Sequence, residues 1–457
     1  MKRSFLILPL AVAAILGAGA LKAHRVAPAR VAVPGMVSAV SPFSGEPISA
    51  PPVERPPYDP ALTYKLVAFY QSRVRMNPQN GAIEWAQLAN AYLQRCRETG
   101  DIADAQRGEQ AARRSLAIRS INNAPARDAL ANSLFTQHRF AEAEALARVT
   151  MAKYQDDPNA RLGYAGAALE RGDYAVAMGV LRDPVVAGQT KPDPSIEAVQ
   201  GRLLDIDGRP AAALRLLQRA QADAESNLDM PRENVAWFHM RVGDELARMG
   251  QADAAARSYG EAMALYPHDY KTMTGLARLA AGRGDWAGTI GWGQKAAQVV
   301  PTPEVVSLVG DAYAATGNRR EADRQYRLVE AIGTISRAQN MVFDRYRAMF
   351  DANHDRNLPE ALALARREMT VRRDVYAYDT LAWALYKNHL LPQAAAAMKQ
   401  AMARDTQDSL LFYHAGTIAA ATGDRGQSQA DFARAAALDP YFRSSTPAAL
   451  QHPYGGF

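Results

Sequence analysis

The sequence predicts an all-α protein, a right-handed α-solenoid of about ten tandem helix pairs. A pattern of small and aromatic residues returns about every 34 residues, which is the period of a stacked repeat array. The pattern is clearest in three consecutive segments, 236–267, 270–301 and 303–336. The composition agrees, because 48% of the residues are hydrophobic and the mean hydropathy of −0.26 excludes a protein with many membrane spans.

Each unit carries residues suited to two closely packed helices. In the segment 236–267, the small residues Gly243 and Ala255 allow the helices to approach, and the large residues Leu246 and Tyr259 fill the space between them. A glycine follows the first helix, as Gly250 does here, and can adopt the left-handed conformation that ends a helix. One unit cannot bury its own apolar face, so stacking of neighbours is predicted to bury it.

Two further kinds of residue mark the helix ends. Asp173 and Asp424 each follow a glycine of this type, and we expect them to cap the next helix. Prolines stop the second helix or begin the next unit, and they stand at positions 158, 267, 301 and 440.

Trp85, Leu88, Ala89 and Tyr92 stand at the spacing of one well-known family. With the recurring pattern, they make the chain resemble a tetratricopeptide repeat protein over about ten units, from residue 82 to 442. The sequence of residues 374–442 resembles a group of exported bacterial tetratricopeptide proteins with no assigned activity. Some members of that group are associated with transition-metal permeases. The resemblance implies a superhelix with a binding groove on the first helices.

The register departs from the pattern in four places. The first unit carries an insertion at 96–100, and longer connections are expected at 183–193 and 221–233. The unit at 339–374 is stretched, with its turn at 353–357.

The chain ends are predicted to lie outside the solenoid, which spans 61–442. Lys2 and Arg3 precede an apolar run over 5–20 that ends in Ala18-Gly19-Ala20, the layout of a secretory signal peptide. The alternative is an uncleaved membrane anchor. Residues 21–60 read as a Pro/Ala-rich linker, 61–76 as a helix that caps the first unit, and 443–457 as a C-terminal tail.

Charge and cysteine content exclude several classes of function. The net charge of +6 is small for 457 residues and forms no basic stripe, so we expect no nucleic-acid partner. The single cysteine, Cys96, excludes an intrachain disulfide, and we expect an inert thiol although Arg95 and Arg97 flank it.

The sequence contains no recognisable catalytic or metal motif, so we expect no enzyme, no cofactor and no metal. The spacing of Asp351, Asn353, Asp355 and Asn357 resembles the start of a calcium loop. The required glycine and glutamate are missing from this stretch, which predicts an ordinary turn between helices.

Binding is the remaining function, and the resemblance places it at positions 2, 5, 9, 12 and 13 of the first helices. Two groups of side chains occupy such positions. The predicted partner-binding groove consists of Tyr376, Asp379, Trp383, Tyr386, Lys387 and Tyr413. Secondary candidates are Trp237, Met240, Asp244, Arg248, Lys271 and Arg278.

We therefore expect an exported scaffold or adaptor that binds a protein or peptide in the periplasm or another part of the cell envelope. The alternatives are a membrane-tethered accessory subunit of an envelope enzyme or metal transporter and, less favoured, an enzyme with an unrecognised site. In the groove, Trp383→Ala is expected to weaken partner capture and to leave the melting temperature nearly unchanged.

Overall fold

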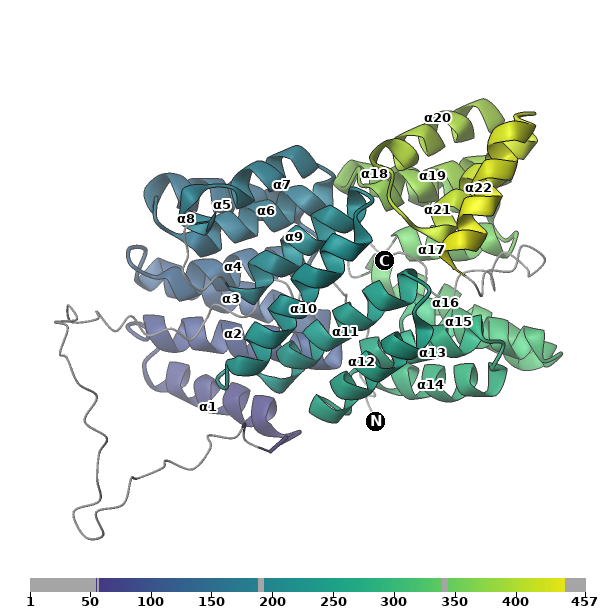
Figure 1. The fold of residues 1–457 in the computed structure, drawn as a ribbon. Coiled ribbons are helices and arrows are strands. Elements are labelled where there is room, and N and C mark those ends of the chain that lie inside the picture. The colour runs from purple at the N-terminus through teal and green to yellow at the C-terminus, as the bar shows by residue number, and fades with distance from the viewer. Residues whose placement is uncertain (1–54, 56, 188–192, 339–343, 440–457) are drawn as a thin grey trace, which may run out of the picture.

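The computed structural model describes residues 55, 57–187, 193–338 and 344–439. This part of the chain forms 22 α-helices and contains no β-strand, as the sequence predicted (Figure 1). The predicted signal peptide, most of the predicted linker and the predicted C-terminal tail lie outside the described residues. None of the described helices combines the length and the hydrophobicity that a membrane crossing needs.

The helices alternate between first and second members of pairs. The first helices are α2 (Ala82–Thr99), α4 (Ala124–Thr136), α6 (Pro158–Arg171), α9 (Pro194–Ile206), α11 (Arg232–Arg248), α13 (Tyr270–Gly282), α15 (Pro303–Ala315), α17 (Asp344–Asn353), α19 (Val375–Lys387) and α21 (Ser409–Ala421). The second helices are α3 (Ile102–Ile118), α5 (Phe140–Lys153), α7 (Tyr174–Leu181), α10 (Pro210–Ser226), α12 (Ala252–Leu265), α14 (Trp286–Val299), α16 (Arg319–Ala338), α18 (Leu358–Val371), α20 (Leu391–Ala401) and α22 (Arg425–Leu438).

These helices make ten consecutive pairs within the described residues, in agreement with the predicted α-solenoid of about ten tetratricopeptide-like units. Each first helix packs on its own second helix, and most first helices also pack on the first helix of the next unit. The helix α1 (Leu62–Met76) packs on α2 and caps the array, as expected. Its buried side, Thr63, Val67 and Val74, has helical spacing.

Glycine ends the first helix in the predicted way. Gly172, Gly250, Gly284, Gly317 and Gly423 all have φ between 72° and 89°, the left-handed region that side chains with a Cβ rarely adopt. The capping prediction is confirmed for one of its two aspartates. Asp424 accepts a hydrogen bond from the Gln427 backbone N–H at 3.0 Å. Asp173 makes no such bond, because its carboxylate lies toward the Arg171 guanidinium at 3.9 Å.

The departures from the repeat pattern are mostly absorbed by helix. The insertion at 96–100 is not a loop, because α2 continues to Thr99 and ends at Gly100 with φ of 82°. The connection at 183–193 contains a short helix, α8 (Pro184–Ala187). α10 runs on to Ser226, so little of the stretch at 221–233 is loop. The stretched unit has its turn where predicted, between α17 and α18.

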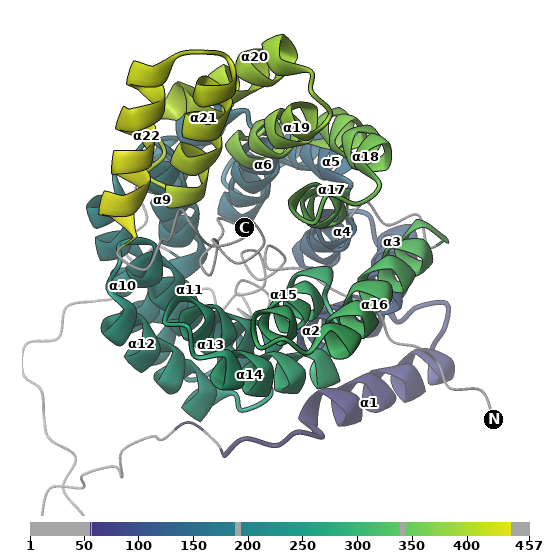
Figure 2. The same cartoon turned by 90° about the vertical axis from the view of Figure 1, so that its right-hand side faces the viewer.

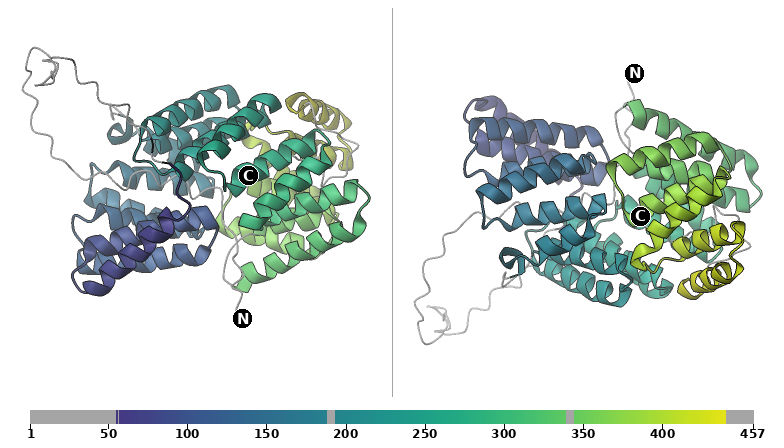
Figure 3. Two further views of the ribbon diagram at one scale, coloured as in Figure 1. Left: turned by 90° about the horizontal axis from the view of Figure 1, so that it is seen from below. Right: turned by 90° about the horizontal axis from the view of Figure 1, so that it is seen from above.

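The pairs wind around a common axis, as the view along it shows (Figure 2). Seen from below and from above, the early and late units lie side by side (Figure 3). The chain returns to itself after about 200 residues, roughly six units of this period. At this point Val375 donates its backbone N–H to the Tyr174 hydroxyl at 2.9 Å. The Thr406 hydroxyl donates to the Ile206 carbonyl at 2.6 Å.

We call the contact between residues 170–208 and 372–408 the seam. Its apolar part is continuous with the core of the earlier units, because Val375, Tyr376 and Leu411 join the cluster built by α6 to α12. Two glycines at helix ends are also part of it. A Cβ on Gly172 would overlap the Arg373 backbone, and one on Gly208 would overlap Asp405. These glycines therefore serve both the local turn and the close approach of a distant unit.

The last residues of the predicted linker are held by the solenoid. Arg55 donates from its guanidinium to the Asn227 carbonyl at 2.8 Å, at the start of the loop before α11. The ring of Tyr58 packs edge-on against Tyr266, with 5.6 Å between centroids. From Arg55 onward, the end of the predicted linker therefore lies against the middle of the array.

A single glycine tests the packing of one helix pair. A Cβ at Gly243 would lie 2.6 Å from the ring of Tyr259, which is buried and donates its hydroxyl to Asp244 at 2.7 Å. Because this ring cannot move away, we expect Gly243→Leu to lower the free energy of unfolding by about 3 kcal/mol in urea titrations. Gly260→Leu is the matched control, since Gly260 is exposed with open space around it. Equal stability of the two variants would contradict this packing.

Candidate functional site

Three of the predicted groove residues form one aromatic cluster on α19 and α21. Trp383 stacks on Tyr386, with 5.0 Å between ring centroids, and lies 6.2 Å from Tyr413. Trp383 itself is only 2% exposed. Its Nε1–H donates to the Asn353 amide oxygen at 2.8 Å, and its ring stacks on His414 at 4.0 Å. The half-buried edges of Tyr386 and Tyr413 are therefore what this cluster presents to a partner.

Tyr376 does not join this cluster, although helical spacing placed it on the same face. It is buried in the seam, where its ring lies 5.1 Å from the Arg202 guanidinium. Its hydroxyl donates to the Asp408 carboxylate at 3.4 Å. The predicted grouping thus holds for Trp383, Tyr386 and Tyr413 only, because α19 presents its first turn to a unit about 200 residues away.

The two charged members of the predicted groove have partners within the protein. Asp379 is buried, and its carboxylate lies 2.8 Å from the Nδ1 atom of His414. The Lys387 ammonium lies 2.6 Å from the Asp355 carboxylate, in the turn before α18. Their place in partner binding stays a prediction.

The charged secondary candidates connect neighbouring units through ion pairs. Asp244 accepts from Arg278 at 3.1 Å, and Arg278 reaches on to Glu304 of the next unit at 2.9 Å. Arg248 pairs with Asp205 of the preceding unit at 2.8 Å. Lys271 and its partner Glu233 are 3.4 Å apart. Trp237 and Met240, in contrast, are buried in the hydrophobic core.

These ion pairs connect neighbouring units. The charged side chains that were predicted to bind a partner therefore already have partners within the protein. Glu245 beside Arg248 shows how strongly this region is desolvated, because burial raises the pKa of Glu245 to about 7 despite the nearby Arg248. A partner cannot reach Trp237 or Met240 in this state, because both side chains are buried.

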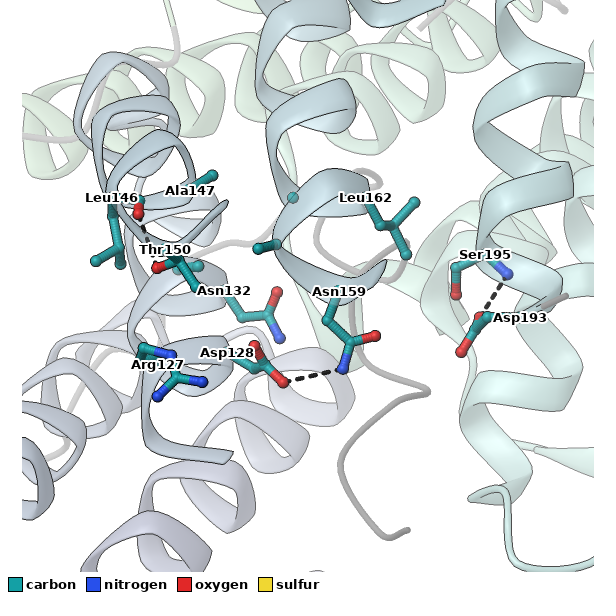
Figure 4. A pocket seen from close by; sticks show the side chains of 13 residues that line it. Arg127, Asp128, Asn132, Leu146, Ala147, Thr150, Asn159, Leu162, Asp193 and Ser195 are labelled. Carbon is teal, nitrogen blue, oxygen red and sulfur yellow. Dashed lines mark hydrogen bonds between the residues drawn. The ribbon is translucent and has the colours of Figure 1, made fainter. Parts of the chain in front are cut away.

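A hollow opens where α4, α5, α6 and α9 meet, and we call it the α4–α6–α9 pocket (Figure 4). Its volume is about 40 Å³. Groove positions from all three first helices line it: Asp128 and Asn132 from α4, Asn159 and Leu162 from α6, and Ser195 from α9. Arg127, Thr150 and Asp193 add further polar groups to its lining.

Local sequence explains how the polar groups reach the pocket. Asp157 and Asp193 cap α6 and α9, accepting from the backbone N–H groups of Asn159 at 3.0 Å and Ser195 at 2.8 Å. Asn159 and Ser195 thereby stand in the first turn, facing the groove. The Asn159 amide donates to the Asp128 carboxylate at 3.1 Å, which joins α6 to α4.

Several polar atoms at this pocket have spare hydrogen-bonding capacity. Within the described part of the chain, no partner is found for the Ser195 hydroxyl or for the Nε and Nη1 atoms of Arg127. Ser195 is 1% exposed and Arg127 is 9% exposed.

No protein-family model matches the sequence, and no curated protein matches it. Solved structures match most of the chain, but with low sequence identity and low TM-scores. Human IFIT1, in a dimer with PPP-AAAA, matches with 12% identity over 84% of this chain and 95% of that chain, at a TM-score of 0.43. A chain of the APC/C hetero-tetramer Cut9–Hcn1 matches with 11% identity over 86% and 82%, at a TM-score of 0.40. Neither likeness bears on function.

Several residues that line the pocket stand at the same repeat positions as the predicted groove residues. Positions 2, 5 and 9 of the units that begin at 124, 158 and 194 include Asp128, Asn132, Asn159 and Ser195. Sequence reasoning chose the aromatic and charged units instead, because large anchors dominate most interfaces. The signal for this pocket was the run of small polar side chains at those positions.

Two other predictions concern the thiol of Cys96 and the calcium-like stretch at 351–357. Cys96 is 1% exposed, and burial raises the pKa of its thiol to about 12, which agrees with an inert thiol and not with activation by Arg97. The calcium-like stretch lies at the end of α17 and in the following turn. Among its carboxylates, Asp351 accepts from Arg347 at 2.7 Å, and Asp355 pairs with Lys387.

Proposed function

We propose that this protein is an exported scaffold that binds an extended segment of a partner protein along the inner face of its first helices. The observation that carries the proposal is the α4–α6–α9 pocket. Its lining includes first-helix residues of three consecutive units, so a segment that runs across the units can contact all three.

Hydrogen bonding supports this kind of ligand. An extended peptide offers main-chain donors and acceptors at regular intervals. At the pocket, the half-buried side chains of Asp128, Asn132 and Asn159 supply partners for such groups. The half-buried Tyr386 and Tyr413 are a second contact region, on α19 and α21. Ion pairs join consecutive first helices between the pocket region and this second contact region. A scaffold that is already ordered loses less entropy on binding.

Site-specific photocrosslinking in an envelope extract tests the proposal. A benzophenone amino acid at Asn159, which is half-buried in the pocket, should crosslink a partner polypeptide. Val149 is the matched control position, because it is 67% exposed on α5 and lies outside the residues that line the pocket. Adducts from both positions in equal yield, or from neither, would contradict binding in the groove.

Export is the second part of the proposal. It rests on the basic start and the apolar run over 5–20, with a small-residue site at 18–20. We expect an extracytoplasmic fraction to contain a mature protein that begins near Leu21 or His24, as read by N-terminal sequencing. Met1 recovered from a membrane pellet would contradict cleavage and favour the tethered accessory subunit. The linker from 21 to Arg55 would then be the tether.

A further inference from the structure

Asp128 is a carboxylate without a cationic partner. The Asn159 amide is its hydrogen-bond donor, and no described residue places a cationic nitrogen within ion-pair distance of it. Its neighbour Arg127 is engaged elsewhere, with its guanidinium 3.7 Å from the Asp157 carboxylate and 3.9 Å from the centre of the Tyr154 ring. A desolvated carboxylate of this kind is neutralised by a proton or by a cation that binds from outside.

The surroundings of Asp128 favour a cation over an anion. The charged groups that face it are Arg127 on its own helix, Asp157 from α6 and Asp193 from α9. The two carboxylates already occupy backbone N–H groups at the starts of α6 and α9, so these helix ends offer less to an anion. Asn132 and Asn159 both lie beside Asp128 in the pocket (Figure 4), and their side-chain amides carry oxygens that can accept from a cation.

The size of the pocket limits the ligand to the end of a side chain. Sites for whole small molecules measure roughly 300–1,000 Å³, whereas this pocket measures about 40 Å³. A compact ammonium group fits this limit better than a planar guanidinium with its five donors.

We propose that the α4–α6–α9 pocket binds a primary ammonium group of the partner protein, with Asp128 as its counter-ion and the amide oxygens of Asn132 and Asn159 as further acceptors. The group is a lysine side chain or a chain N-terminus. The inference rests on the proposed function, since the ammonium belongs to the segment bound along the groove.

Binding of the ammonium is coupled to loss of a proton. Burial, followed by the charge of Asp157, raises the pKa of Asp128 to about 7. The ammonium binds the deprotonated carboxylate, so affinity rises as the pH rises through 7. From pH 6 to pH 8 the deprotonated fraction grows about tenfold, and the affinity for a lysine should grow by about the same factor. A chain N-terminus loses its own proton near pH 8, so its affinity should level off there.

Phage-displayed random dodecapeptides, selected on the immobilised full chain at pH 8, test the inference. We expect the selected sequences to contain a lysine or to need a free N-terminus. The selected peptide is then synthesised with a free or acetylated N-terminus and with each lysine replaced by norleucine. Fluorescence polarisation should show a loss of about tenfold when the critical ammonium is removed. A peptide that tolerates acetylation but not norleucine identifies a lysine.

The Asp128→Asn variant shows whether the ammonium binds at this pocket. It should lose the pH dependence and show less than a twofold difference between the lysine and norleucine peptides, with an unchanged circular dichroism spectrum and melting temperature. Asp253→Asn is the matched control, because the Asp253 side chain is 86% exposed on α12. The control should behave like the unmodified protein.

The outcomes separate the inference from the proposed function. Peptides that bind independently of any ammonium and of pH would overturn the inference and leave the groove function standing. Equal effects of Asp128→Asn and Asp253→Asn, or selection of acidic peptides, would also overturn it. If no peptide is selected and Asn159 yields no crosslink, both proposals fail.

Discussion

Arg372→Ala should open the seam and lower the free energy of unfolding by about 3–5 kcal/mol, because it leaves a buried carboxylate unpaired. Arg372 is 5% exposed and donates to Glu170 of α6 at 2.8 Å. It also lies 3.0 Å from the Glu368 carboxylate, and its guanidinium lies 4.8 Å from the centre of the Phe140 ring. Thermal or urea unfolding measures the loss of stability. Small-angle scattering measures the opening as an increase in the radius of gyration.

Arg373→Ala is the control for this prediction. The Arg373 side chain is exposed, and its contribution to the seam is the backbone N–H, which donates to the Arg171 carbonyl at 3.0 Å and remains in the variant. We expect a change of less than about 0.5 kcal/mol. Similar losses from both substitutions would mean that the buried ion pair does not hold the seam.

The defect of Arg372→Ala should shrink as the pH falls. Burial raises the pKa of Glu170, and Arg372 is the largest influence that opposes this rise. Without Arg372 the pKa of Glu170 rises further. As the pH falls, the folded variant then takes up a proton before the unfolded chain does, which favours the folded state. A pH series of unfolding curves for both proteins tests the sign. A defect that grows at low pH would contradict it.

The repeat units and the seam show what sequence reasoning could and could not predict. The repeat, the pairing of helices and the cap by α1 depend on residues within one or two units, so a 34-residue period predicts them. The seam depends on the exact curvature of the whole superhelix. Gly172 reads in the sequence as an ordinary helix-end glycine, and nothing nearby in the chain indicates that Arg373 will lie against it.

The candidate site shows the same limit. The repeat positions taken from the family pattern selected Trp383, Asp244 and Arg248 on first helices. Whether such a position is open or buried depends on how closely the next turn approaches, which the pattern does not contain. Asp244 and Arg248 pair with neighbouring units, whereas no cation among the described residues pairs with Asp128 on α4. The α4–α6–α9 pocket is therefore lined by polar side chains, whereas sequence reasoning expected aromatic anchors.

Trp383 carries the other large expected effect. With 2% of its surface exposed, it fills the space between α17, α19 and α21, where Met349 and Ala352 pack around it. Its Nε1–H donates to Asn353, and its ring stacks on His414. This setting replaces the expectation that Trp383→Ala would leave the melting temperature unchanged. Removing a buried indole typically costs about 3–5 kcal/mol, so the last units of the array should unfold early.

Circular dichroism during thermal unfolding should show this loss for Trp383→Ala, as a separate early transition of the C-terminal units. Trp383→Phe is the graded control. It keeps an aromatic ring against His414 and removes the bond to Asn353, so we expect a loss of about 1–2 kcal/mol. The half-buried Tyr386 tests partner binding apart from stability, because Tyr386→Ala removes a ring edge that a partner can reach. If Trp383→Ala instead weakens partner capture at an unchanged melting temperature, the indole is a binding residue and its packing contributes little to the fold.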